Sequence, residues 1–180
     1  EAFIADELVF LQQVEHPSFE AVLSQVVEAA GTRLAYLMIP KPRGLADLQR
    51  AVTAVEAAEL SAGLRQPIPL HALVETHGAL REVMALAAHP RIESLSFGLM
   101  DFVSAHRGAI PSSAMGATGQ FEHPLVLRAK LEISAACHAF AKTPSHCVVT
   151  EFKDKLALDA AATQASRQLG YTRMWSIHPD

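Results

Sequence analysis

The fold is decided by residues 68–102, which read IPLHALVETHGALREVMALAAHPRIESLSFGLMDF. This stretch opens with one apolar run, Ile68–Glu75, and contains a second, Ile92–Phe97, each of the length of a buried strand. The segment between the runs has apolar residues at the spacing of one helix face, namely Leu80, Val83, Met84 and Leu86. The stretch therefore predicts a strand–helix–strand unit, the building block of parallel sheets.

The same alternation continues on both sides of this unit. The expected strands are Leu34–Ile39, Ile68–Glu75, Ile92–Phe97, Cys147–Phe152 and Arg173–Ile177, with residues 8–11 as a sixth candidate. The expected helices include Pro17–Ala30, one through Leu45 to Val55, one through Leu127 to Ala135 and one ending at Leu169. Ser18 is the expected N-cap of the first helix, and Gly31 its left-handed stop. A polar loop is expected over Val103–His123.

Alternating strands and helices favour parallel strands with right-handed crossovers, in either an open doubly wound sheet or a (β/α)8 barrel. No strand is followed by a Gly-rich phosphate-binding motif, which an open nucleotide-binding sheet would carry. A closed barrel needs about 250 residues, more than the 180 here. We therefore expect residues 1–180 to form a single (β/α)8 TIM barrel domain that lacks its first two or three β-α units.

Composition excludes several classes of protein. The chain is 50% hydrophobic with a formal net charge of −4, which indicates a large core and argues against a nucleic-acid partner. No apolar run approaches the roughly 20 residues of a membrane span, and the first residues lack a basic signal-peptide region. The two cysteines, Cys137 and Cys147, are too few for a disulfide framework and do not have the spacing of a C-x-x-C metal site. These features predict a cytoplasmic protein with no membrane partner.

Two acids stand at the ends of consecutive expected strands. Glu75 follows Leu73 and Val74, and Asp101 follows the next strand. Neighbouring strands lie about 4.8 Å apart, so both carboxylates can reach one point, where they would repel by roughly 4 kcal/mol at 4 Å and an effective dielectric of 20. Either one carboxylate takes up a proton, or a hard divalent cation such as Mg2+ binds between them. The alternative role of each acid is to cap a helix or pair with a surface base.

Other polar residues at strand ends are weaker candidates. Lys41 follows the strand ending at Ile39 and is either a contact for an anionic ligand or a solvated lysine. His77 is a candidate substrate contact. His71 shares the strand alternation of Glu75, so it either faces the metal site or is a hydrogen-bonded core histidine.

For several further residues we expect a structural role or leave a structural alternative open. Glu151 and Asp154 are expected to serve the N-terminus of the following helix, and Cys147 to pack in the core. His178 and Asp180 end the last strand, as ligand contacts or as a turn. Ser112 and Ser113 show no pattern of a nucleophile.

Four ordered segments, taken together, resemble the HpcH/HpaI aldolase/citrate lyase beta-subunit family. Ala72-Leu73-Val74-Glu75-Thr76 matches its A-L-[IV]-E-T pattern, and Phe97-Gly98-Leu99-Met100-Asp101 matches F-G-x-x-D, with the acids 26 positions apart. Met38-Ile39-Pro40-Lys41 resembles its M-[VL]-P-K strand, and residues 170–179 resemble its closing G-[FY]-x-[GR]-[KM]-W-[AS]-I-H-P. The resemblance runs from about residue 16 to the end of the chain.

The resemblance implies a (β/α)8 barrel that works as a carbon–carbon lyase. It implies that Glu75 and Asp101 bind Mg2+ (Mn2+ is the alternative ion), which chelates a keto or hydroxy acid. The implied reactions cleave or form citryl-, malyl- or citramalyl-CoA thioesters through a metal-stabilised enolate. The resemblance also implies a homo-oligomer, a trimer or hexamer.

The chain departs from the family pattern at several places, among them an early acidic pair that is not identified and the turn Thr76-His77-Gly78, which lacks the arginine often found before that glycine. The expected substrate-clamping arginine is not identified, and residues 12–13 near its place are glutamines. Met100 stands where a glutamate is common, and the family's C-terminal lid would follow residue 180. Two alternatives therefore remain, a pyruvate-type class II aldolase without coenzyme A and a non-catalytic acid-binding relative.

Overall fold

The computed structural model describes residues 13–151 and 153–177. The strands are β1 (Leu37–Ile39), β2 (Leu70–Val74), β3 (Ile92–Phe97), β4 (Thr143–His146) and β5 (Arg173–Met174). The helices are α1 (Phe19–Ala30), α2 (Leu45–Ser61), α3 (His77–Arg81), α4 (Val83–Ala88), α5 (Leu99–Ala105), the 3-10 helix η1 (Ser112–Met115), α6 (Gly119–Glu122), α7 (Pro124–Ala139) and α8 (Lys155–Leu169).

The five strands form one sheet in chain order, and every neighbouring pair is parallel. This arrangement is that of consecutive strands in a (β/α)8 barrel, so the predicted α/β fold class is confirmed. Pairing of Val74 with Phe97 brings the carboxyl ends of β2 and β3 side by side. Residues that follow these two strands therefore meet at one end of the sheet.

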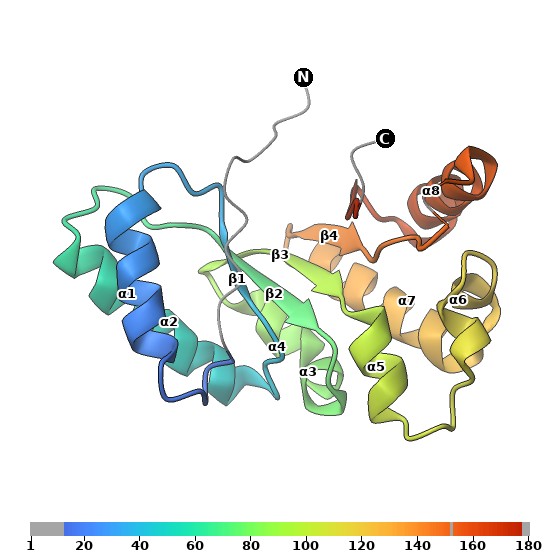
Figure 1. The fold of residues 1–180 in the computed structure, drawn as a ribbon, viewed down its shortest axis with the longest axis horizontal. Coiled ribbons are helices and arrows are strands. Elements are labelled where there is room, and N and C mark those ends of the chain that lie inside the picture. The colour runs from blue at the N-terminus through green and yellow to red at the C-terminus, as the bar shows by residue number, and fades with distance from the viewer. Residues whose placement is uncertain (1–12, 152, 178–180) are drawn as a thin grey trace.

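The helices follow one another in the same order as the strands. Contacts run from α1 to α2, from α2 to α4, from α4 to α7 and from α7 to α8 (Figure 1). One large apolar core joins α1, α2, α4 and α7 to the outer face of the sheet, and Leu23, Val55, Leu86 and Ile133 are fully buried in it. Most of the periodic apolar positions recognised in the sequence are thus core-facing, but Met84 is 50% exposed.

The predicted strand Cys147–Phe152 is wrong, because β4 spans Thr143–His146 and ends where the apolar run begins. The sequence of this strand is polar. It can nevertheless be buried, because its side chains form hydrogen bonds inside the fold. Thr143 donates a hydrogen bond to Glu93, and His146 is hydrogen-bonded to Lys130. The strands β1 and β5 are also shorter than predicted, and the helix expected around Leu80–Leu86 is divided into α3 and α4 at Glu82.

The predicted N-cap and left-handed stop of α1 are wrong, and the predicted loop 103–123 contains helices. Ser18 makes no side-chain cap for α1, because its hydroxyl is hydrogen-bonded to His16 instead. Gly31 adopts a right-handed conformation with φ −52°, and a Cβ there would lie 2.5 Å from the carbonyl oxygen of Val27. The expected loop 103–123 contains the end of α5, η1 and α6.

The single-domain boundary 1–180, the missing N-terminal units and the lid stay predictions. The candidate strand 8–11 and the candidates His178 and Asp180 lie outside the described residues. Among the described helices, none combines the length and the apolar character that a membrane crossing requires.

Candidate metal centre

The loop after β1 brings a lysine to the carboxyl end of the sheet. Lys41 has a positive φ of 47°, an uncommon conformation for a non-glycine residue. In this conformation its backbone N–H donates a 3.0 Å hydrogen bond to Oε1 of Glu75. The β1 loop therefore orients the carboxylate that follows β2.

Glu75 lies directly after β2 and is only 4% exposed. The chain of β3 passes so close that a Cβ at Gly98 would lie 2.4 Å from Oε2 of Glu75, so only glycine fits there. Burial, followed by the neighbouring Asp101 carboxylate, raises the pKa of Glu75 to about 8. Two acids that share a confined site without a bound cation show this behaviour.

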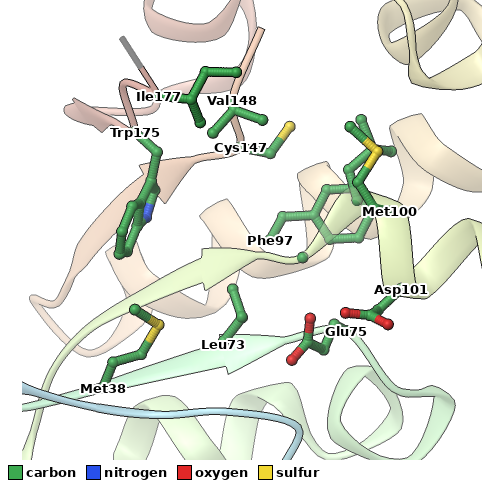
Figure 2. Close-up of a pocket in the computed structure, with 12 residues that line it drawn as sticks. Met38, Leu73, Glu75, Phe97, Met100, Asp101, Cys147, Val148, Trp175 and Ile177 are labelled. Atoms are coloured by element: carbon green, nitrogen blue, oxygen red, sulfur yellow. The ribbon is translucent and has the colours of Figure 1, made fainter. Parts of the chain in front are cut away.

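Asp101 lies in the first turn of α5, and its carboxyl group faces that of Glu75 (Figure 2). The ammonium nitrogen of Lys41 lies 2.9 Å from Oδ1 of Asp101, and both side chains are partly exposed. The hydrogen bond that Lys41 donates to Asp101 is the largest factor that raises the pKa of Lys41. The predicted pair of acids and Lys41 are thus brought together in one centre.

The centre has the donors that Mg2+ requires. This ion is typically held by one or two carboxylates and keeps water or substrate oxygens in its other positions. Within residues 13–151 and 153–177, no group of three or more His, Cys, Asp or Glu side chains is placed to hold a metal. The Glu75–Asp101 pair therefore fits an open Mg2+ site and does not fit a closed structural site.

A cavity of about 260 Å³ adjoins the two carboxylates. Residues from the carboxyl ends of all five strands line it, with Met38 from β1, Leu73 from β2 and Trp175 after β5 among them (Figure 2). Cys147 and Val148, which follow β4, form the opposite side. A small molecule in this cavity would contact the acids at one end and apolar side chains elsewhere.

Both histidine candidates lie apart from this cavity lining. His71 is fully buried and is hydrogen-bonded to Ser94 (2.6 Å) and Ser96 (2.7 Å). Of the two predicted roles, it is therefore a hydrogen-bonded core histidine. His77 begins α3, is exposed, and its ring is hydrogen-bonded to the carbonyl of Ala105. A substrate contact by His77 or Lys41 stays a prediction.

The acids after β4 have separate roles. Asp154 caps α8 by accepting hydrogen bonds from the N–H groups of Leu156 and Ala157, as predicted. Glu151 instead accepts hydrogen bonds from Ala117 and Thr150 and ties a loop, so its predicted helix-capping role is wrong. Cys147 is buried, as expected, and it also lines the cavity.

Sequence reasoning missed a buried polar cluster behind the cavity wall. Lys130 is fully buried and donates hydrogen bonds to Gln120 (2.7 Å) and to Nε2 of His146 (2.9 Å), beside Cys147. Burial lowers the pKa of Lys130 to about 8 and that of His146 to about 3. The available signal was helical spacing, since Lys130 falls on the face of α7 that also buries Val126 and Ile133.

The parallel α/β sheet and the acids at its carboxyl end define a protein of the TIM-barrel type with a two-carboxylate centre. The model of one protein family, HpcH/HpaI aldolase/citrate lyase, matches residues 6–179. The chain belongs to this family, which confirms the resemblance seen in the sequence.

Named relatives and solved structures agree with this assignment. The L-malyl-CoA/beta-methylmalyl-CoA lyase of Cereibacter sphaeroides is 27% identical over 95% of the chain and 56% of the relative. The malyl-CoA/beta-methylmalyl-CoA/citramalyl-CoA lyase of Chloroflexus aurantiacus is 27% identical over 88% of the chain and 50% of the relative. The crystal structure of a citrate lyase from Burkholderia xenovorans is 51% identical, with a TM-score of 0.91 over 94% of this chain and 53% of that one. The chain thus spans about half the length of these relatives.

Proposed function

We propose that this chain carries the metal centre of a Mg2+-dependent carbon–carbon lyase. The proposed reaction cleaves or forms a hydroxyacyl thioester such as citryl-, malyl- or citramalyl-CoA. The observation that carries the proposal is the convergence of Glu75 and Asp101 beside a cavity. Membership of the family and the names of the malyl-CoA lyase relatives support the substrate class.

Glu75 and Asp101 would hold the ion, with Mn2+ as the alternative. A bound divalent ion supplies Lewis-acid stabilisation of the negative charge that develops on a substrate carbonyl oxygen during this cleavage. The chain's own contribution is positioning. The backbone N–H of Lys41 fixes one oxygen of Glu75, while Gly98 leaves room for the other.

The apolar cavity walls contribute by limiting water around the bound acid. A site with less water strengthens electrostatic interactions, because the local dielectric is lower. Met38, Leu73 and Trp175 form such a wall next to the carboxylates. The ammonium group of Lys41 is paired with Asp101, so contact with an anionic substrate would require the lysine side chain to leave that carboxylate.

Metal and acid binding test the first half of the proposal. Isothermal titration of the chain with Mg2+ and pyruvate is expected to show binding that Glu75→Gln and Asp101→Asn each weaken at least tenfold. Glu122→Gln, which changes an exposed acid on α6, is the matched control and is expected to bind as the unchanged chain does. Equal binding by all the variants would contradict the metal centre.

Turnover tests the second half. We expect release of a keto acid from malyl-CoA or citramalyl-CoA in the presence of Mg2+. Cleavage of free hydroxy-keto acids alone would instead identify the pyruvate-type aldolase.

A non-catalytic acid-binding role is the second candidate, and one observation favours it. The ammonium group of Lys41 already neutralises Asp101, and no arginine is among the described residues that line the cavity. Mg2+-dependent acid binding without turnover of either substrate class would establish this role.

We also propose a homo-oligomer in a cytoplasmic setting. Family membership supports the oligomer, and sedimentation velocity would measure it. Both cysteines are buried and unpaired, which fits a reducing compartment.

A further inference from the structure

Two hydrogen bonds tie the loop after β1 to the end of β2. The backbone N–H of Lys41 donates one to Glu75 (3.0 Å), and the hydroxyl of Thr76 donates the other to the carbonyl oxygen of Pro42 (2.8 Å). Two consecutive residues of one segment thus hold two consecutive residues of the other, an arrangement that we call the loop clamp. The first bond orients a proposed metal ligand, and the second holds the residue that follows Lys41 in the chain.

We propose that Thr76 is a positioning residue of the metal centre, because its hydroxyl holds the β1 loop so that the N–H of Lys41 stays on Glu75. This inference rests on the proposed function and adds a residue that acts on the centre through the backbone. The hydroxyl is engaged by two main-chain groups, since it donates to the carbonyl of Pro42 and accepts from the N–H of Ala79.

The backbone of Lys41 is in a conformation that requires a restraint. Its φ of 47° is unfavourable for a residue with a Cβ, and the proline that follows it favours an extended conformation instead. Local preference therefore draws Lys41 away from the conformation in which its N–H binds Glu75. A strained backbone of this kind persists where contacts from outside the segment hold it.

Pro42 is the residue through which the restraint acts. A proline has no N–H, so its carbonyl oxygen is the only backbone group that can hold it by a hydrogen bond. Pro42 is buried, and loss of the Thr76 hydroxyl would remove the bond that the structure gives to this carbonyl. The bond to Thr76 therefore fixes the position of the loop next to Lys41.

The first turn of α3 supports the same loop by close packing. A Cβ at Gly78 would overlap the carbonyl oxygen of Arg43, so the loop approaches the helix as closely as a glycine permits. Thr76 and Gly78 thus hold the adjacent residues Pro42 and Arg43. Thr76 is also the N-cap of α3, a role that would explain the threonine without the loop, so the test has to separate the two.

Hydrogen–deuterium exchange of the metal-free chain, followed by NMR, tests the loop clamp at the amide of Lys41. Thr76→Val removes the hydroxyl, so we expect this amide to exchange about fivefold faster, and Thr76→Ser is expected to restore the slow rate. Gly78→Ala displaces the loop but keeps the cap, so it is expected to accelerate exchange at Lys41 and not at Ala79. The amide of Ala72, inside β2, reports global unfolding and is expected to keep its rate.

Isothermal titration with Mg2+ tests the consequence for the metal centre. We expect Thr76→Val and Gly78→Ala to weaken Mg2+ binding about threefold or more, and Thr76→Ser to bind as the unchanged chain does. Thr53→Val is the matched control, because it removes a hydroxyl that donates a 3.0 Å hydrogen bond to the carbonyl of Gln49 within α2. This control is expected to change neither the exchange of Lys41 nor the Mg2+ affinity.

The two measurements separate this inference from the proposed function. If the unchanged chain does not bind Mg2+, the proposed metal centre is wrong, and the exchange rates alone show whether Thr76 holds the N–H of Lys41 on Glu75. If Mg2+ binds and Thr76→Val folds but leaves the exchange of Lys41 or the Mg2+ affinity unchanged, only the inference is wrong. Faster exchange at Ala79 without a change at Lys41 would assign Thr76 to helix capping and would also overturn the inference.

Discussion

The ammonium group of Lys41 lies 2.9 Å from a carboxylate oxygen of Asp101, at the carboxyl end of the sheet. The backbone of the same lysine binds Glu75. One residue of the β1 loop thus contacts both acids, through its main chain and through its side chain. The main-chain contact positions a carboxylate, whereas the side-chain contact competes with any cation that the acids could bind.

Removing the Lys41 ammonium is expected to strengthen metal binding. In Lys41→Met the backbone N–H remains, but the competing charge is lost, so we expect Mg2+ to bind about threefold more tightly, in keeping with the small energies of exposed ion pairs. Isothermal titration measures the change. Lys155→Met, at an exposed residue of α8, is the control. Weaker Mg2+ binding by Lys41→Met would show that the ammonium supports the centre.

A methyl group at Gly98 is expected to displace Glu75. The added Cβ would lie 2.4 Å from Oε2, so Gly98→Ala is expected to cost about 1–3 kcal/mol of unfolding free energy and at least tenfold in Mg2+ affinity. The matched control is Gly63→Ala, where nothing lies within 4 Å but φ is 66°. That variant is expected to cost about 1 kcal/mol and to bind Mg2+ normally. Equal Mg2+ affinities for the two variants would disprove the close approach.

Acid is expected to destabilise the chain through His71. Burial, followed by the charge of Arg173, lowers the pKa of His71 from 6.5 to about 4. Because the unfolded chain binds this proton more readily, the contribution of His71 is fully present above pH 6.5 and is lost as the pH falls toward 4. The loss is about 3 kcal/mol.

Urea unfolding at pH 7, 5.5 and 4.5 measures this dependence. His71→Asn retains hydrogen-bonding groups for Ser94 and Ser96 but does not titrate, so the stability of this variant is expected to fall less steeply with acid than that of the unchanged chain. Identical slopes for the two proteins would exclude His71 as the cause.

Base is expected to stabilise the chain through Lys130. Burial lowers the pKa of this lysine from 10.5 to about 8, so between these two values the unfolded chain holds a proton that the folded chain has released. Stability therefore rises with pH across this window, by about 3 kcal/mol. The difference in unfolding free energy between the unchanged chain and Lys130→Met isolates the effect. A difference that stays constant from pH 7.5 to 10.5 would contradict it.

Local patterns in the sequence were sufficient for the fold class and for the two acids. Apolar runs and helical spacing predicted β2 and β3. Glu75 directly follows β2 and Asp101 lies four residues after the end of β3, so both share one end of a parallel sheet in any such fold. The pattern failed at β4 because Thr143–His146 is polar. Its side chains find partners on α7 and β3, which no local pattern reveals.

The amino-acid sequence by itself determined the parallel α/β architecture, the family and the presence of paired carboxylates, since these depend on periodicity and on short motifs. Only the tertiary structure decided that Lys41 neutralises Asp101, that Glu75 is buried with a raised pKa, and that Lys130 is enclosed. The physical reason is that charge and hydration depend on distances across the sheet. Sheet register and twist set those distances between residues that lie tens of positions apart in the chain.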